Sequence, residues 1–324
     1  MALRTAAAAA LLALVGGCSA QEAIPSSIPT TATSAPPQWR TMAEAPTPRT
    51  EITGAALDDR ILLMGGFVEG GGTVPLVEVY LPLEDRWEEG PPLPIALNHA
   101  MSTVADGNVI VAGGYRGPGL TNPSDRVFAL SDGENWVETA PLPEPRAAGG
   151  MAAVGATLVM AGGVGTNGLI ETTAVWQPET ADWEEVAGLI TPREHLGVAS
   201  VDGAVYTVGG RTTGLGNLAS FEVFDLEAMD WERLEDLPTP RGGLAASAID
   251  DMVIAVGGEE QATFDEAEVY DVVTAEWASL PPLPTARHGL AVVSWEDTLF
   301  VLSGGLTPGY SFSAVNEALT LGTG

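Results

Sequence analysis

The sequence has no lysine and a single cysteine. All 13 basic residues are arginines, and the chain of 324 residues holds three histidines. The absence of lysine excludes Schiff-base chemistry and a P-loop, because both need a lysine amine. The lone cysteine, Cys18, excludes a disulfide framework and a cysteine-based structural zinc site. So few histidines argue against a histidine-rich metal centre, and we expect neither a metal nor another cofactor.

Positive charge is scarce throughout. Against 13 basic residues stand 43 acidic ones, which gives a formal net charge of −30. A general nucleic-acid binder is excluded, because neutralising phosphates needs a basic field. Repulsion between copies favours a soluble monomer. Hydrophobic residues still make up 45% of the chain, which is enough for a substantial core.

The N-terminus has the layout of an export signal. Arg4 precedes an apolar run at residues 6–15, which is too short to span a bilayer as a stable helix. Residues 15–18 (VGGC) resemble a bacterial lipobox, in which Cys18 is lipidated and becomes the new N-terminus. Ordinary cleavage after Ala20 is the alternative. We expect residues 1–17 to be removed and Cys18 to anchor the protein in the cell envelope.

The segment that follows is poor in apolar groups. Residues 18–37 are rich in Ser, Thr, Ala and Pro, a composition that cannot bury a core. We expect a disordered tether there, and a folded domain over residues 38–324.

That domain consists of six copies of one motif. A glycine pair closes an apolar run in each copy, at intervals of 47 to 49 residues, and a tryptophan precedes each pair by 26 or 27 residues. The pairs begin at Gly65, Gly113, Gly162, Gly209, Gly257 and Gly304, and the tryptophans are Trp39, Trp87, Trp136, Trp183, Trp231 and Trp277. In five copies a further aromatic residue stands seven or eight positions before the tryptophan: Tyr80, Phe128, Trp176, Phe224 and Tyr270.

This register of glycine pair, aromatic residue and tryptophan resembles the kelch repeat. The resemblance covers residues 38–324 and implies an all-β fold, a kelch-type β-propeller with one four-stranded antiparallel blade per repeat. The repeats themselves predict the same units, because each contains four short strand signals, with small residues in the innermost strand. We therefore expect six blades. Trp39 precedes the first glycine pair without a repeat of its own, so the last blade should combine an N-terminal strand with three C-terminal strands.

Alternation of the strands sorts the loops onto two faces. The connections between repeats and the loops after the glycine pairs should share one face, and those loops vary in composition. An arginine stands ten residues after the tryptophan in five copies, and two more follow glycine pairs. We predict that these seven surround the mouth of the central channel on that face, where they either bind an anionic ligand or lock the blades together: Arg49, Arg146, Arg193, Arg241, Arg287, Arg116 and Arg211.

Two histidines share another position of the repeat. His99 and His195 both stand twelve residues after a tryptophan, and both are candidate binding residues or solvated loop residues. The acidic residues beside the tryptophans should form a solvated outer rim.

The leading functional hypothesis is a non-catalytic binding module for a protein, peptide or glycan. It rests on fold analogy. An enzyme acting on acidic sugars, such as a sialic-acid mutarotase-like isomerase or a lyase, is the second hypothesis; the kelch resemblance suggests it, with Glu194, His195 and Glu259 as candidate acid–base residues. A structural subunit of an envelope complex is the third.

Overall fold

The computed structural model describes residues 37–131 and 133–322. In these residues all regular secondary structure is β-strand, and no helix there is long and apolar enough to cross a membrane. The predicted signal peptide, Cys18 and all of the predicted tether except Pro37 lie outside the described residues.

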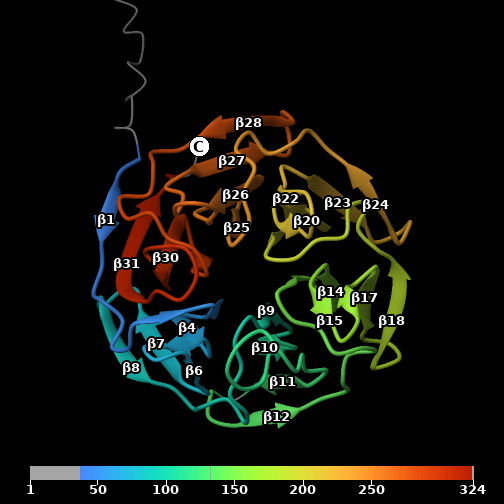
Figure 1. Ribbon diagram of the computed structural model, residues 1–324, viewed down its shortest axis with the longest axis horizontal. Helices are drawn as coiled ribbons and strands as arrows, with labels where there is room; N and C mark the ends of the chain where they lie inside the picture. The colour runs from blue at the N-terminus through green and yellow to red at the C-terminus, as the bar shows by residue number, and fades with distance from the viewer. Residues whose placement is uncertain (1–36, 132, 323–324) are drawn as a thin grey trace, which may run out of the picture. The chain divides into compact units, whose positions relative to one another are not determined.

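Five four-stranded antiparallel sheets stand around a common axis as the blades of a β-propeller (Figure 1). In each sheet the first strand lies nearest the axis and the last strand at the rim. The strands are β3 (Thr53–Leu57), β4 (Arg60–Met64), β7 (Val77–Leu81) and β8 (Arg86–Glu89); β9 (Met101–Ala105), β10 (Asn108–Ala112), β11 (Val127–Leu130) and β12 (Trp136–Glu138); β13 (Gly150–Val154), β14 (Thr157–Ala161), β17 (Thr172–Gln177) and β18 (Asp182–Ala187); β19 (Gly197–Val201), β20 (Ala204–Val208), β23 (Phe221–Asp225) and β24 (Asp230–Arg233); and β25 (Ala245–Ile249), β26 (Met252–Val256), β27 (Ala267–Asp271) and β28 (Glu276–Ser279).

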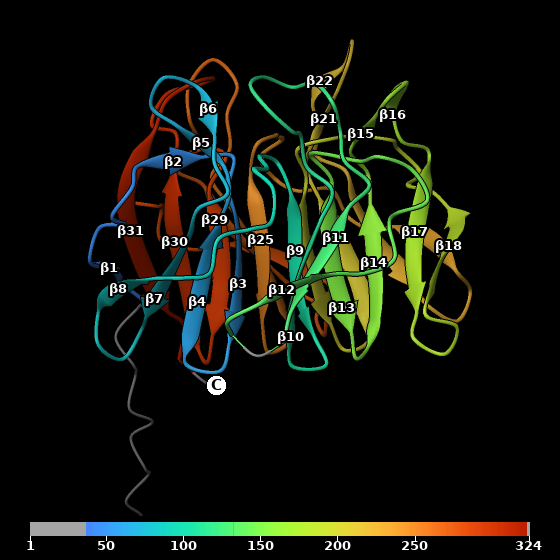
Figure 2. The same ribbon diagram turned by 90° about the horizontal axis from the view of Figure 1, so that it is seen from below.

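The remaining sector is a larger sheet of seven strands. It has the order β29-β30-β31-β2-β5-β6, with β1 also paired to β31. These strands are β29 (Ala291–Trp295), β30 (Thr298–Gly304), β31 (Ser313–Thr320), β2 (Arg49–Thr50), β5 (Phe67–Val68), β6 (Gly72–Thr73) and β1 (Trp39–Thr41). Two short hairpins, β15 (Val164–Gly165) with β16 (Gly168–Leu169) and β21 (Arg211–Thr212) with β22 (Gly216–Asn217), rise from other loops (Figure 2).

The prediction of six separate four-stranded blades is wrong, since the described residues form five. The long strand β31 is the reason. Its first residue, Ser313, pairs with Arg49, so hydrogen bonding continues from the last repeat into the first. The predicted joining of the two ends is present, because β1 pairs with β31 through Trp39 and Leu319.

A hydrophobic cluster fills the space between each pair of neighbouring sheets. Between the first two sheets, for example, Leu62 and Val79 pack with Val109 and Phe128. The cluster that closes the circle joins Tyr80 of the first sheet to Phe300 of the seven-stranded sheet. Strands buried on both faces need apolar side chains without alternation, which explains the continuous apolar runs before the glycine pairs.

The glycine pairs join each repeat to the next. A Cβ at Gly113 would lie 2.3 Å from the carbonyl oxygen of Arg146, and Gly114 donates a 2.8 Å hydrogen bond to that oxygen. Both glycines have positive φ, at 66° and 90°. The first glycine therefore permits the close approach that the second one uses.

The last repeat departs from the predicted pairing. Ser303 and Gly304, with φ of 50° and 103°, hold the conformation of the other five pairs, and Gly305 does not. The register of β30 against β31 shifts between Leu302 and Gly304. Ser303 stands 26 residues after Trp277, so the structure restores the spacing of the other five repeats.

The repeated tryptophans also connect neighbouring repeats. In five of the six, the indole Nε1 donates to a carbonyl four residues after the previous tryptophan. Trp39 donates to the carbonyl of Pro281 over 2.8 Å and so links β1 to the segment that follows β28. Trp231 differs, because it donates to the hydroxyl of Thr173.

Candidate functional site at the channel mouth

Six residues form a ring around the axis at the face that carries the loops after the glycine pairs. They stand twelve positions after the tryptophans and are Glu51, His99, Ala148, His195, Gly243 and Gly289. Each N–H donates a hydrogen bond of 2.8–3.0 Å to the carbonyl of the ring residue before it, and Glu51 completes the circle by donating to Gly289. All six have positive φ, which is uncommon outside glycine. All six residues of the ring thus share one backbone conformation, which fixes the direction in which each side chain leaves the ring.

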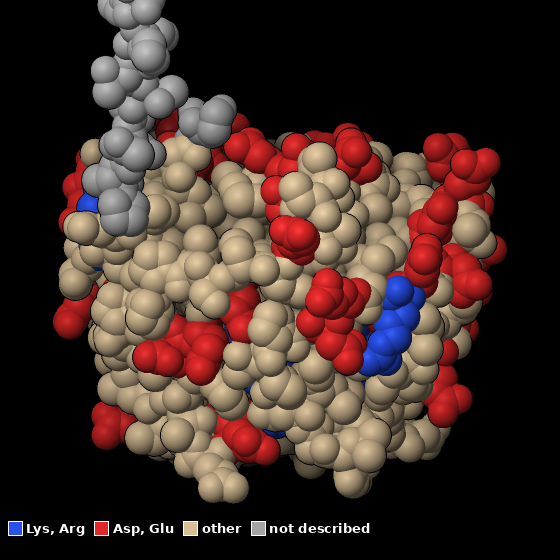
Figure 3. Space-filling view, turned by 90° about the horizontal axis from the view of Figure 1, so that it is seen from above, with Lys and Arg blue, Asp and Glu red and all other residues tan. Residues whose placement is uncertain are grey.

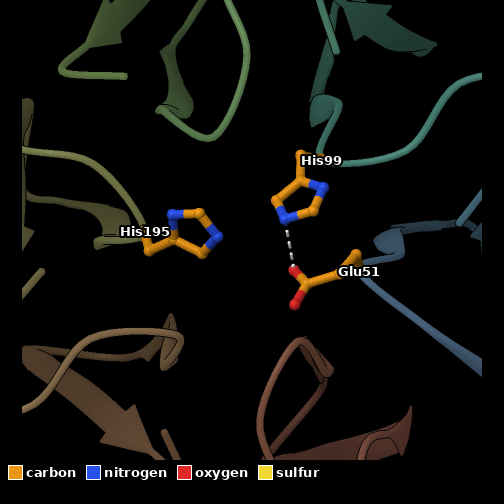
Figure 4. Close-up of side chains that lie close together, drawn as sticks. All are labelled: Glu51, His99 and His195. Carbon is orange, nitrogen blue, oxygen red and sulfur yellow. Dashed lines mark ion pairs between the residues drawn. The ribbon is translucent and has the colours of Figure 1, made fainter. Parts of the chain in front are cut away.

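Three side chains of this ring face one another across the axis (Figure 4). Glu51, His99 and His195 each offer one carboxylate oxygen or imidazole nitrogen, and these three atoms all lie within 4.8 Å of one another. Nε2 of His99 is 3.0 Å from Oε2 of Glu51. The two imidazole rings meet edge to face, with centroids 4.8 Å apart.

The hydrogen bonds of Asn98 fix the tautomer of His99. The Asn98 amide nitrogen faces three oxygen acceptors, those of Thr73, Tyr115 and Gly117. Its carbonyl oxygen Oδ1 therefore faces His99, and Nδ1 of His99 donates to it over 2.7 Å. In the neutral imidazole the lone pair is then on Nε2, the atom that faces Glu51.

Acidic partners orient His195 in the same way. Nδ1 of His195 donates to Oε2 of Glu194 over 2.8 Å, while the other carboxylate oxygen of Glu194 is 3.2 Å from Nε of Arg211. Arg211 also reaches Glu259 over 2.8 Å. Nε2 of His195 is buried and has no hydrogen-bond partner among the described residues.

The third histidine, His288, supports the ring from outside. Its Nε2 donates to the carbonyl of Thr307 over 3.1 Å. Its Nδ1 lies 3.4 Å from one oxygen of Glu51 and 3.4 Å from one oxygen of Glu259, without the geometry of a hydrogen bond to either. A positive imidazolium is the form of His288 that fits between two carboxylates.

These contacts shift the pKa values of the cluster. Burial alone would raise the pKa of Glu51, but His99 and His288 outweigh burial and hold this pKa well below its usual range. Burial lowers the pKa of His99, against the opposing effect of Glu51. Burial would also lower the pKa of His288, but Glu51 and Glu259 raise it. For Glu194, His195 and Arg211 overcome burial and bring the pKa to about 2.

The five arginines of the repeat do not line the mouth, which corrects their predicted position. Arg49, Arg146, Arg193, Arg241 and Arg287 are 0–1% exposed. Arg193, for example, donates to the carbonyl of Gly209 over 2.8 Å and to the carboxylate of Glu222 over 2.7 Å. Carboxylates of Glu78, Glu268 and Glu317 hold Arg49, Arg241 and Arg287 in the same manner. These side chains turn back between the strands and satisfy buried carbonyls there.

Arg116 and Arg211 remain at the loop face. Arg116 is exposed, and Arg211 is half-buried between Glu194 and Glu259. The wall of the molecule carries acidic side chains and few cations (Figure 3). The outermost strands β8, β12, β18 and β24 expose most of their acidic residues, as the predicted solvated rim requires.

The ring lies at the bottom of a small pocket. A cavity of about 90 Å³ above it is lined by the ring residues Glu51, His99 and His195 and by the loop residues Phe67, Leu120 and Tyr310, together with Thr50, Arg211, Glu259 and Gly309. Below the ring the axial cavity is lined mainly by small residues at the innermost strands, with a few larger ones such as Met101 and Met151. The sequence placed His99 and His195 at this mouth but missed Glu51 and His288. Glu51 stands twelve residues after Trp39, so the same spacing would have found it.

Comparison with known proteins decides the family. The model of the KLHDC2/KLHL20/DRC7 Kelch-repeats domain family matches residues 98–305, and the model of the Kelch motif matches residues 48–94. The chain belongs to the kelch-repeat family. Its glycine pairs and tryptophans are therefore the landmarks of kelch repeats, as the resemblance implied.

Several curated kelch proteins are similar over part of the chain. The Kelch-like protein terF of Aspergillus terreus is 29% identical over 231 residues, which cover 65% of this chain and 49% of that protein. Beta-scruin of Limulus polyphemus is 26% identical over 54% of this chain and 20% of its own length. The Kelch repeat and BTB domain-containing protein A55 of Vaccinia virus is 25% identical over 49% of this chain and 28% of its own length. The chain thus spans half or less of these relatives.

Proposed function

We propose that this protein is a lipid-anchored, extracytoplasmic binding module that holds a protein or peptide at its loop face. The loop face is the face that bears the ring and the loops after the glycine pairs. Kelch propellers commonly bind proteins, which supports the proposal at the level of the family. A net charge of −30 favours basic partners, because complementary charge speeds association and discriminates against acidic surfaces.

The observation that carries this proposal is the exposure of apolar side chains on the loops. Four apolar side chains on these loops are 42–73% exposed: Leu120, Leu215, Leu306 and Tyr310. They come from three loops, because Leu306 and Tyr310 share the loop between β30 and β31. These side chains are available for contact with a partner at the loop face. Apolar contact rather than sugar stacking is what leucine side chains provide, so we place a polypeptide ahead of a glycan.

The opposite face supplies a matched control. Leu83 and Val273 are 75% and 74% exposed, but they lie in turns between the third and fourth strands of their blades, at the other end of the axis. We expect Leu215→Ser with Tyr310→Ser to reduce capture of a partner from envelope extracts by at least tenfold. Leu83→Ser with Val273→Ser should leave capture within twofold. Equal capture by both double variants, with unchanged melting temperatures, would refute a binding role for the loop face.

The anchor is the second part of the proposal. The apolar run at residues 6–15 and the lone Cys18 support it. The first described strand also begins at the end of the axis away from the loops, because Trp39 pairs with Leu319 near the end of β31. The start of the described domain therefore lies away from the loop face. We expect Cys18→Ser to move the protein from the detergent phase to the aqueous phase in a detergent partition experiment, and an unchanged distribution would contradict lipidation.

A further inference from the structure

Two imidazole nitrogens and a carboxylate oxygen converge at the channel mouth. His195 carries the clearest sign, since its side chain is 3% exposed and its Nε2 has no hydrogen-bond partner among the described residues. Leaving a buried polar atom unpaired destabilises the folded state. A polar group that is aimed into a polar cluster at such a cost calls for a ligand.

His99 presents its second nitrogen to the same cluster. Because Nδ1 carries the proton that Asn98 accepts, Nε2 of the neutral ring turns a lone pair toward Glu51 at 3.0 Å. A lone pair and a carboxylate oxygen repel each other at this distance unless a proton or a cation lies between them. A metal cation would satisfy His99, Glu51 and His195 at once.

We propose that Glu51, His99 and His195 bind a divalent transition metal, with Zn²⁺ as the best fit. Two imidazoles and one carboxylate are ligands that Zn²⁺ favours in sites with an open position, at bond lengths of about 2.0–2.2 Å. In a tetrahedral site, ligands at these bond lengths stand about 3.4 Å from one another. The three donor atoms already lie within 4.8 Å of one another, so side-chain shifts of about 1 Å would close the site.

The surroundings of the three ligands match those of metal sites. Metal-bound histidines usually donate their other ring N–H to a carboxylate or carbonyl, which fixes the tautomer and orientation. His99 donates to the Asn98 carbonyl oxygen and His195 to the Glu194 carboxylate. His288 faces the second oxygen of Glu51 and leaves the first one turned toward the axis.

Three protein ligands leave at least one position for an exogenous donor. That position opens on the cavity lined by Phe67, Leu120 and Tyr310. Water or a donor atom of a bound molecule would complete the coordination there. Since two of the three ligands are nitrogens, Ca²⁺ and Mg²⁺, which prefer oxygen, should bind far more weakly.

The test is calorimetric titration of the metal-stripped full chain with Zn²⁺, in a Cys18→Ser background that removes the only thiol. We expect one high-affinity Zn²⁺ per chain. His99→Asn and His195→Asn should each weaken binding on the order of 100-fold or more, because loss of an outer partner alone costs about 10–100-fold. Asparagine tolerates the positive φ of these positions, so the ring should still form.

Two further variants distinguish the site from adventitious binding. Glu194→Gln removes the carboxylate that orients His195 and pairs with Arg211, and it should weaken Zn²⁺ by about 10–100-fold. Glu260→Gln removes an exposed charge from the same face and should change nothing. Co²⁺ in the same site should give the visible absorption of a low-coordinate ion, and both histidine variants should abolish it. Zn²⁺ affinity that is equal in the wild type and in folded His99→Asn and His195→Asn chains would overturn the proposal.

Discussion

The position ten residues after the tryptophan is stabilised in three different ways among the six repeats. In four repeats the third strand carries a glutamate, which pairs across the sheet with the second residue before the glycine pair, or before Ser303–Gly304 in the last repeat. This glutamate forms an ion pair with the arginine of the repeat: Arg49 with Glu78, Arg193 with Glu222, Arg241 with Glu268 and Arg287 with Glu317. In the second repeat Leu97 takes the place of the arginine and Phe128 that of the glutamate, and the two pack in the same hydrophobic cluster. A hydrophobic pair can replace a buried ion pair without loss of stability.

Arg146 follows neither solution. The residue opposite is Ala174, and the nearest carboxylate, Glu144, is 4.0 Å away and partly exposed. The guanidinium instead donates to the carbonyls of Met160 and Thr172. Burial lowers the pKa of Arg146 to about 10, with only weak opposition from Glu144 and Glu185.

This contrast predicts unequal costs for one substitution. Arg193→Leu would leave Glu222 fully buried and without its cation, so we expect a loss of about 3–5 kcal/mol in the free energy of unfolding. Arg146→Leu leaves only carbonyls unpaired and should cost about 1–3 kcal/mol. Urea denaturation of both variants measures the difference, and the double variant Arg193→Leu, Glu222→Phe should recover part of the loss, as the second repeat does. Equal costs for the two single variants would contradict this account.

At the scale of the strand, the last repeat carries the least regular element. Ser303 adopts φ of 50° where the other repeats have glycine, and its Oγ is buried without a hydrogen-bond partner among the described residues. The left-handed conformation costs a non-glycine residue about 1 kcal/mol, and the unpaired hydroxyl adds to the cost.

Ser303→Gly should therefore stabilise the protein. We expect the free energy of unfolding to rise by about 1 kcal/mol, because residue 303 has a left-handed φ of 50° that glycine adopts without strain. Thermal unfolding measures it, with Ser294→Gly as the control in a strand of normal conformation, where a loss is expected. A lower melting temperature for Ser303→Gly would show that the hydroxyl is needed.

The strand pattern was largely accessible from the sequence, and side-chain direction was not. Continuous apolar runs, tight turns and the regular glycine pairs locate the strands, because burial on both faces leaves its trace in composition. The arginines ten residues after tryptophan were placed at the mouth because their backbone lies at the loop face. Their side chains turn inward, toward carbonyls that no sequence pattern reveals.

At the scale of the whole molecule, the closing of the circle was predictable and the unequal sheets were not. The tryptophan without a preceding repeat marks the strand that joins the C-terminal strands. The extension of that sheet into β2, β5 and β6 depends on the pairing of Ser313 with Arg49, two residues whose identities do not announce it. The cluster of Glu51, His99 and His195 likewise depends on three repeats that are brought around one axis, and only the shared spacing from tryptophan hints at it.

The circle of backbone hydrogen bonds at the mouth separates the width of the opening from its chemistry. Each N–H of the six residues already donates to a neighbouring carbonyl, so widening the opening would break backbone hydrogen bonds. What the aperture recognises is left to the side chains, and only three of the six project a functional group. A position such as Ala148 can therefore acquire a new group while the ring keeps its diameter, which lets one scaffold change its specificity one sector at a time.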